Sequence, residues 1–394
     1  MPSRQRPTTD SSSLLLSRRS ALGRLAVTLG ALAVAKQNAI ARALQGTGLA
    51  KAFRKDFRMG VAVSNEALDQ QIAAQLDLIA REFNSVTGEN AMKWGVIRPD
   101  GVNWQWERAD RLVDFANRHR MDLLGHTLVW HSQIPATVFV DAQGQRLSRA
   151  ALLAKMREHI ETLVGRYKGR AWAWDVVNEA VDEDKGWRRS QWHEIIGDDF
   201  MEQAFRFAHA ADPKAQLLYN DYNMHNPGKI AFLAEVLKDY LARRVPIHGV
   251  GNQSHVGLNY PDLTQWEHGI ATFADLGLKV HITELDVDVL PPPADTGADV
   301  ANRNAYSREL DPWPQGLPDN IEEQLADRYE ALFRILLRYR KSVERVTFWG
   351  LHDGISWKNN FPVRGRTNYP LLFDRQMHPK PAYERLMKLA GGKR

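Results

Sequence analysis

The 394-residue sequence predicts an α/β fold, a single (β/α)8 barrel, and three observations carry this prediction. From about residue 49 onwards, short apolar segments rich in β-branched residues alternate with segments whose apolar residues recur every three or four positions. Eight such strand–helix pairs follow one another, with no visible second domain, linker or short-period repeat. No glycine-rich phosphate fingerprint follows the first strand, which disfavours an open, doubly wound sheet.

The predicted strands are apolar runs at 57–63, 84–90, 122–130, 171–180, 216–221, 247–253, 280–286 and 345–349. The predicted helices lie at 68–83, 107–118, 148–167, 192–211, 230–241, 263–276, from 320 onwards and at 380–389. The helix from 320 is expected to begin with Asn320 as its cap and Glu323 three residues later, which is the capping-box pattern. Extended loops are expected after the seventh and eighth strands.

Residues 1–43 have the pattern of an export signal. The segment from Ser17 to Gly23 resembles a twin-arginine motif, an apolar run spans 25–35, and small-residue cleavage sites lie at 39–43. A single anchoring helix is the alternative, but the apolar run is too short to span a bilayer comfortably. We therefore expect residues 1–43 to be removed and the protein to be exported to the periplasm or out of the cell. Residues 44–394 would then form the barrel domain, with no membrane attachment.

The charge distribution and the absence of cysteine exclude several classes of function. The first 43 residues carry a net charge of +6, so the total of +5 leaves a net −1 for the rest. The basic pI therefore belongs to the leader and argues against nucleic acid as a partner of the folded part. The chain has no cysteine, which excludes disulfides, thiol catalysis and cysteine-ligated metals.

Polar and aromatic side chains gather at the carboxyl ends of the predicted strands, where barrel enzymes hold their catalytic groups. They include Glu89, Asn90, Lys93, His126, Trp130, His131, Gln133, Asn178, Glu179, Asn220, Asp221, Tyr222, Gln253, His255, Glu284, Asp286, Trp349 and Trp357. Amides, imidazoles and lysines form paired hydrogen bonds with sugar hydroxyls, and the faces of pyranose rings lie flat on Trp and Tyr. Phosphate would instead require arginine clusters or glycine nests. The mixture favours a sugar polymer as the ligand.

Two glutamates, Glu179 and Glu284, follow separate apolar strands and are expected to face each other across the barrel mouth. Retaining glycoside hydrolysis needs such a pair, one ionised and one protonated. Glu284, held by hydrogen-bond donors, is expected to stay ionised, and its charge would keep Glu179 protonated near neutral pH. Asp286 lies two residues after Glu284 and shares its face of the strand, where it can fix the tautomer of His255.

Several of these aromatic and histidine residues also have a structural interpretation. Trp172 and Trp174 are expected to pack in the barrel, because buried aromatic side chains are common. A lone histidine is more often structural than catalytic. Three histidines with carboxylates could ligate zinc, but neither a His-x-His pair at the first strand nor a His-Glu-x-x-His pattern is present. We therefore expect no metal and no cofactor.

Five motifs, in order along the chain, resemble the signatures of glycoside hydrolase family 10, the endo-β-1,4-xylanases. They are TGENAMKW at 87–94, GHTLVWHSQ at 125–133, WDVVNE at 174–179, GNQSH at 251–255 and ITELD at 282–286. The resemblance extends from about residue 49 to the end of the chain. It implies a barrel enzyme that hydrolyses internal β-1,4-xylosidic bonds of xylan and xylo-oligosaccharides with retention of anomeric configuration. We expect the protein to be a monomer.

Carried onto this chain, the resemblance implies Glu179 as the acid/base and Glu284 as the nucleophile. Asn178 is expected to bind the 2-hydroxyl of the sugar attacked, and His255, oriented by Asp286, to hydrogen-bond Glu284. The other implied substrate-binding or supporting residues are Glu89, Asn90, Lys93, His126, Trp130, His131, Gln133, Tyr222, Gln253, Trp349 and Trp357.

The loops depart from the family pattern. Residues 136–139 replace a segment that often carries Trp, and the loop after the eighth strand is long and basic. We expect Arg364 or Arg366 in that loop to contact an acidic branch of the substrate.

Two alternative functions stay open: a retaining barrel glycosidase that prefers β-1,4-glucan, and a non-catalytic carbohydrate-binding protein on the same scaffold. The second usually lacks a catalytic carboxylate, whereas both glutamates are present here.

Overall fold

The computed structural model describes residues 48–182, 186–293 and 303–392 of the chain. The predicted export signal, residues 1–43, lies outside the described residues. Part of the loop after the seventh barrel strand, residues 294–302, lies outside them as well. In the ranges that are described, no helix combines the length and the apolar character needed to cross a membrane.

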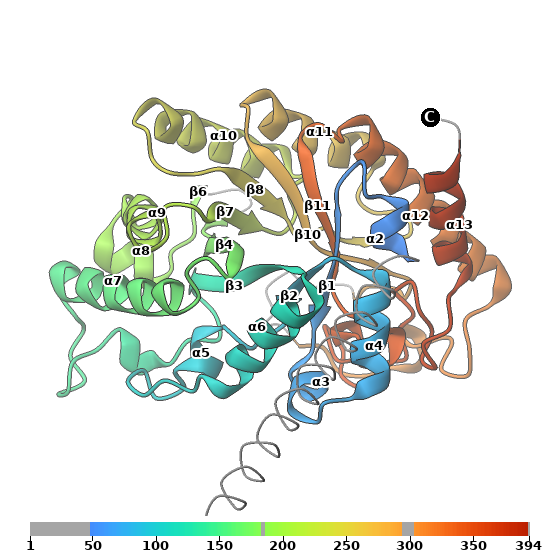
Figure 1. Cartoon of the computed structure of the whole chain (residues 1–394), viewed down its shortest axis with the longest axis horizontal. Helices are drawn as coiled ribbons and strands as arrows, with labels where there is room; N and C mark the ends of the chain where they lie inside the picture. The colour runs from blue at the N-terminus through green and yellow to red at the C-terminus, as the bar shows by residue number, and fades with distance from the viewer. Residues whose placement is uncertain (1–47, 183–185, 294–302, 393–394) are drawn as a thin grey trace, which may run out of the picture. The chain divides into compact units, whose positions relative to one another are not determined.

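Eight parallel strands form a closed barrel, which confirms the predicted fold (Figure 1). They pair in the order β1, β2, β3, β4, β7, β8, β10 and β11, and β11 pairs with β1 to close the ring. The bounds are β1 Arg58–Val63, β2 Ser85–Gly88, β3 Asp122–Trp130, β4 Ala171–Asn178, β7 Gln216–Asp221, β8 Gly249–Asn252, β10 Lys279–Asp288 and β11 Val343–Phe348. Nearly every residue of these strands is buried, because helices cover the sheet outside and side chains fill it inside.

Three short strands lie beyond the barrel proper. β9, His255–Gly257, continues from β8 and pairs with the end of β10. β5, Val181–Asp182, and β6, Gly186–Trp187, pair antiparallel just after β4. All three follow the carboxyl ends of barrel strands, so they build up the wall of the barrel mouth.

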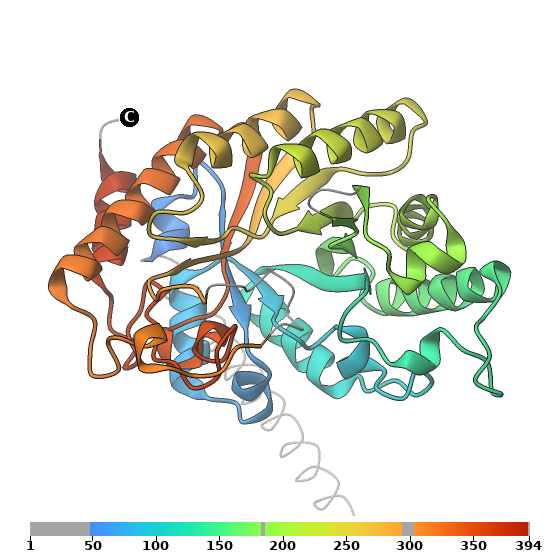
Figure 2. The same cartoon turned by 180° about the vertical axis from the view of Figure 1, so that it is seen from behind.

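Helices surround the barrel on its outside, as both views show (Figure 1, Figure 2). Several start at side-chain caps: Ser148 accepts a hydrogen bond from the Ala151 amide at α7, and Asn226 caps α10 just before Pro227. The bounds are α2 Leu49–Ala52, α3 Asn65–Asp69, α4 Ala73–Glu82, α5 Trp94–Ile97, α6 Glu107–His119, α7 Arg149–Arg166, α8 Gln191–Ile196, α9 Phe200–Ala211, α10 Pro227–Ala242, α11 Leu263–Asp275, α12 Asp319–Arg338 and α13 Pro381–Gly391.

Two predicted helices are each two helices in the structure. The segment 68–83 divides into α3 and α4, because Gln71 takes a φ of +50° between them. The segment 192–211 divides into α8 and α9 at Gly197, whose φ is +100°. Only glycine adopts that conformation without a clash of its Cβ. The apolar spacing continues across both breaks, so periodicity alone does not reveal them.

The predicted capping box at Asn320 is wrong. α12 begins one residue earlier, at Asp319, and no side chain caps its first turn. Pro318 occupies the capping position, where its missing amide donor costs nothing. Asp319 places a carboxylate in the first turn, where the helix dipole stabilises it.

Candidate active site

The carboxyl ends of the barrel strands surround a cavity of about 960 Å³. All but two of the predicted site residues line it: Glu89, Asn90, Lys93, His126, Trp130, Gln133, Asn178, Glu179, Tyr222, Gln253, His255, Glu284, Trp349 and Trp357. These residues lie in seven different barrel strands or in the segments that follow them. Closure of the barrel brings them together from positions far apart in the chain.

Glu179 directly follows β4 and is 6% exposed. Its φ of +57° lies in the left-handed region, which costs a non-glycine residue about 1–2 kcal/mol. Its amide donates to the carbonyl of Asn220 over 2.9 Å, and Arg188 Nε donates to its carbonyl over 2.9 Å. The carboxylate is held on both oxygens, by Trp130 Nε1 at 2.8 Å and by Gln253 Nε2 at 2.9 Å. Backbone and side chain of Glu179 are therefore both fixed.

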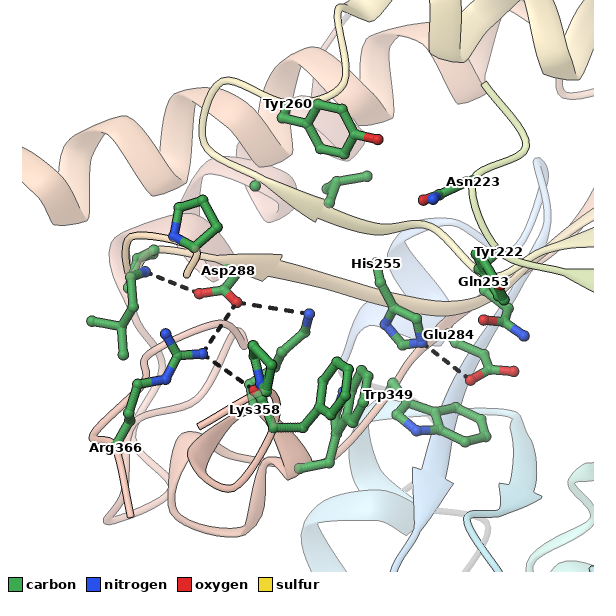
Figure 3. A pocket seen from close by; sticks show the side chains of 18 of the residues that line it. Tyr222, Asn223, Gln253, His255, Tyr260, Glu284, Asp288, Trp349, Lys358 and Arg366 are labelled. Atoms are coloured by element: carbon green, nitrogen blue, oxygen red, sulfur yellow. Dashed lines mark hydrogen bonds and ion pairs between the residues drawn. The ribbon is translucent and has the colours of Figure 1, made fainter. Parts of the chain in front are cut away.

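Glu284 lies within β10 and is 5% exposed. Asn220 Nδ2 donates to its Oε1 over 2.9 Å, and His255 Nε2 lies 3.3 Å from its Oε2 (Figure 3). Burial by itself would raise the pKa of Glu284. The hydrogen bond with His255 and the neighbouring positive charges outweigh burial and lower that pKa below its ordinary value. Glu284 is therefore ionised at neutral pH.

His255 is held between two carboxylates. The pairing of β9 with β10 sets His255 beside Asp286, with 3.0 Å between Nδ1 and Oδ1. Asp286 also accepts a hydrogen bond from Trp357 Nε1 over 2.7 Å. Burial by itself would lower the pKa of His255, but Asp286 and Glu284 outweigh it and raise the pKa to about 9. At neutral pH the ring is therefore an imidazolium that donates to both carboxylates.

Asn220, at the end of β7, connects the surroundings of the two glutamates. Its Nδ2 donates to Asn178 Oδ1 over 2.8 Å as well as to Glu284. Gln253 Nε2, which donates to Glu179, also lies 3.4 Å from Asn178 Oδ1. The sequence marked Asn220 only as a strand-end amide, without a role. Its bridging position follows from the barrel, which places β4, β7 and β10 around one mouth.

On another side of the cavity, Lys93 Nζ donates to Asn90 Oδ1 over 3.0 Å and lies 4.9 Å from the centroid of the Trp130 ring. Burial raises the pKa of Glu89 and lowers the pKa of Lys93, and the opposite charges of the pair oppose both shifts. Glu89, Asn90 and Lys93 therefore present hydrogen-bond donors and acceptors to the cavity from one short segment after β2.

His126 and His131 differ in placement although five residues separate them. His126 Nδ1 lies 2.9 Å from Asp175 Oδ2, at a point where β3 pairs directly with β4. The pairing then shifts register before Val129, which marks a bulge of the kind often found beside active sites. His131 does not line the cavity, and its ring stands edge-on to Trp130 with the centroids 5.9 Å apart.

The other predicted residue outside the cavity lining is Asp286, which is fully buried behind His255. Its role in the geometry is to hold His255 and Trp357, each of which does line the cavity. Over the ranges that the structure describes, no three His, Asp or Glu side chains converge as metal ligands.

The basic loop after β11 meets the cavity through Lys358 and Arg366, on either side of Asp288 (Figure 3). Arg366 is 3% exposed, and its guanidinium donates to the carbonyls of Pro291 and Phe361, so it holds loops together. Arg364 is exposed and does not line the cavity. Of the two arginines, only Arg366 lines the cavity, and its contact with an acidic branch stays a prediction.

Comparison with known proteins gives three consistent results. Residues 48–389 match the family model described as glycosyl hydrolase family 10. Endo-1,4-beta-xylanase A of Xylanibacter ruminicola is 42% identical over 336 residues, which cover 85% of this chain and 91% of that protein. The endo-1,4-beta-xylanase of Geobacillus stearothermophilus is 41% identical over 346 residues, with 86% and 98% covered.

A solved structure agrees with the sequence matches. A family 10 endoxylanase from a sugarcane soil metagenome matches with a TM-score of 0.85 and 50% identity, covering 87% of this chain and 100% of that one. Each of the five motifs that resemble the family contributes at least one residue to the lining of the cavity. The chain belongs to glycosyl hydrolase family 10.

Proposed function

We propose that this protein is an endo-1,4-β-xylanase that hydrolyses xylan and xylo-oligosaccharides with retention, using Glu179 as acid/base and Glu284 as nucleophile. One observation carries the assignment: two buried carboxylates, from β4 and β10, line one cavity and are connected through Asn178, Asn220 and Gln253. The relatives at 42% and 41% identity are both endo-1,4-beta-xylanases by name.

In the first step, the ionised Glu284 attacks the anomeric carbon, and the bond from that carbon to the leaving oxygen breaks as Glu179 gives the oxygen a proton. Asn178 is suited to hold the 2-hydroxyl of the same sugar. Its Nδ2 is buried and has no hydrogen-bond partner among the described residues. Hydrogen bonds to this hydroxyl strengthen in the transition state, so a donor placed here lowers the barrier.

In the second step, water releases the sugar from Glu284. Formation of the covalent intermediate removes the charge of Glu284, and Glu179, now ionised, takes a proton from the attacking water. The ester bond breaks and Glu284 regains its charge, which Asn220 and the imidazolium of His255 stabilise. Two successive inversions at one carbon give retention.

The remaining predicted residues supply binding. We assign the sugars before the scissile bond to six residues that line the cavity: Glu89, Asn90, Lys93, His126, Trp130 and Gln133. Trp349 and Trp357 offer ring faces to the sugars. The supporting roles go to His131, Tyr222, Gln253, His255 and Asp286.

We also propose that residues 1–43 direct export to the periplasm or out of the cell, that they are removed, and that the mature protein acts as a monomer. The support is the twin-arginine-like segment and the cleavage pattern of the sequence. Amino-terminal sequencing of the protein from culture fractions of its native host tests the export. An intact Met1 on soluble cytoplasmic protein would contradict it.

Proton NMR of xylohexaose hydrolysis tests the proposed reaction. The β-anomer of internal cleavage products is expected within the first minutes, before mutarotation, and the Glu179→Gln and Glu284→Gln variants serve as paired controls. Early α-anomer would refute the assignment of Glu284 as a nucleophile. Faster cleavage of cellohexaose would favour a glucanase instead, and binding without cleavage would favour a carbohydrate-binding protein.

A further inference from the structure

Behind Glu179 lies a group of three buried side chains that the reaction itself does not use: Tyr219, Asp221 and Lys229. Each is 0% exposed. Tyr219 and Asp221 belong to β7, and Lys229 lies in the first turn of α10. A buried lysine and a buried aspartate are rare in a core, and their presence one layer behind a catalytic carboxylate calls for a physical reason.

The Tyr219 hydroxyl reaches the chain immediately after Glu179. The amides of Ala180 and Val181 both donate to it, over 3.1 Å and 3.2 Å. These are the two residues that lead the chain away from the left-handed turn at Glu179. Without this acceptor, two consecutive buried amides would lack a partner at the point where the backbone is already strained.

The proton of the Tyr219 hydroxyl is directed elsewhere, to Asp221 Oδ2. The other oxygen of Asp221 accepts from Lys229 Nζ over 2.7 Å and from the amide of Tyr222 over 2.9 Å. Burial raises the pKa of Asp221, and the charge of Lys229 with its hydrogen bond opposes that rise and favours the carboxylate. Two amides already donate to the Tyr219 oxygen, so the acceptor left for the hydroxyl proton is Asp221. Tyr219 therefore has to donate to Asp221, and both lone pairs of its oxygen stay available for the two amides.

A second arm of the same network reaches the cavity. Lys229 Nζ lies 4.0 Å from the centroid of the Tyr222 ring, which lines the cavity. Arg188 donates to the Tyr222 hydroxyl and, through Nε, to the carbonyl of Glu179. The backbone of Glu179 is thus held from both sides, by Arg188 on its carbonyl and by Tyr219 on the two amides that follow.

We infer that Tyr219 is a positioning residue for the acid/base, that it acts through the amides of Ala180 and Val181, and that the buried Asp221–Lys229 pair sets the direction of its hydroxyl. This inference rests on the proposed role of Glu179. A general acid has to meet the leaving oxygen within hydrogen-bond reach, so a small displacement of the turn weakens proton transfer more than it weakens binding.

The Tyr219→Phe variant tests the inference, since it keeps the ring and removes only the hydroxyl. On xylohexaose, whose leaving group needs a proton, we expect kcat/KM to fall about 10- to 100-fold, mainly through kcat. On 2,4-dinitrophenyl β-xylobioside, whose leaving group needs none, we expect a fall of less than about 3-fold in kcat/KM. The ratio of the two values does not depend on the fraction of folded enzyme.

Tyr240→Phe is the matched control, because Tyr240 is 3% exposed in α10 and does not line the cavity. It should leave the ratio unchanged. An equal loss on both substrates in Tyr219→Phe, with the selective loss seen in Glu179→Gln, would overturn the positioning role while leaving the acid in place. No selective loss in Glu179→Gln would instead overturn the proposed function. If Tyr219→Phe does not fold, Asp221→Asn is measured in the same way, with the same ratio expected.

Discussion

Replacement of Glu179 by Gln gives a prediction whose size follows from the contacts of this side chain. The loss of general acid catalysis costs about 10²- to 10⁴-fold in rate, or about 3–5 kcal/mol at the transition state. The new amide also has one NH2 group where Glu179 has two acceptor oxygens. Trp130 can only donate, so the amide oxygen has to face Trp130 and the NH2 group has to face Gln253.

Gln253 then has to turn its own amide to accept, which removes its 3.4 Å contact to Asn178 Oδ1. That loss adds about 1 kcal/mol, or roughly 5-fold. The two factors multiply, so we expect kcat/KM on xylohexaose to fall by about 5 × 10²- to 5 × 10⁴-fold in Glu179→Gln. On 2,4-dinitrophenyl β-xylobioside, the rate constant of the glycosylation step should fall by roughly 10-fold or less. This leaving group needs no proton, so only the loss of the contact between Gln253 and Asn178 applies.

Stopped-flow measurement of dinitrophenolate release separates the two steps. A burst followed by a slow steady state is expected in Glu179→Gln, because the missing base slows release of the sugar from Glu284. In Glu179→Ala, added azide should restore the second step by attacking the glycosyl-enzyme, which yields β-xylobiosyl azide and frees the Glu284 carboxylate. A loss of equal size on both substrates, without a burst, would show that Glu179 does not transfer the proton.

Two further predictions concern buried charges. In Asp286→Asn, His255 loses the carboxylate that raises its pKa to about 9, so NMR of the labelled imidazole should move its titration towards 6.5. Because the folded pKa lies above the unfolded value, this charge stabilises the parent fully below about pH 6.5 and ceases to do so as the pH rises through about 9. The melting temperature of the parent should therefore fall more over that interval than that of the variant. Lys380 Nζ lies 2.9 Å from Oδ2 of the fully buried Asp353. Lys380→Met removes this cation and leaves the carboxylate unpaired, so the free energy of unfolding measured in urea should fall by about 3–5 kcal/mol. Lys388→Met is an exposed change within α13, the helix that begins directly after Lys380, and it should cost less than about 0.5 kcal/mol. Similar losses in the two variants would show that the Lys380–Asp353 pair is not the cause.

The barrel was predictable because its signal is local and repeated. The bounds of β3 and β7 agree with the predicted segments, since each is a buried apolar run bounded by turns. The breaks at Gln71 and Gly197 were not predictable from spacing, because a single left-handed residue divides a helix without changing the apolar pattern around it. The start of α12 was also missed, since Asn320 fits a capping pattern that Pro318 makes unnecessary.

The sequence by itself determined which side chains reach the mouth of the barrel. The carboxyl ends of the barrel strands meet at this mouth, so Glu179, Gln253 and Glu284 were identified from their positions and motifs, although His131 and Asp286 do not line the cavity. Only the tertiary structure decided which of those side chains touch. Asn220 joins two glutamates because β4, β7 and β10 surround one mouth, and Tyr219 reaches the chain beyond Glu179 because β4 and β7 are neighbours. Such contacts depend on strand order and register, which bring together residues that no local pattern connects.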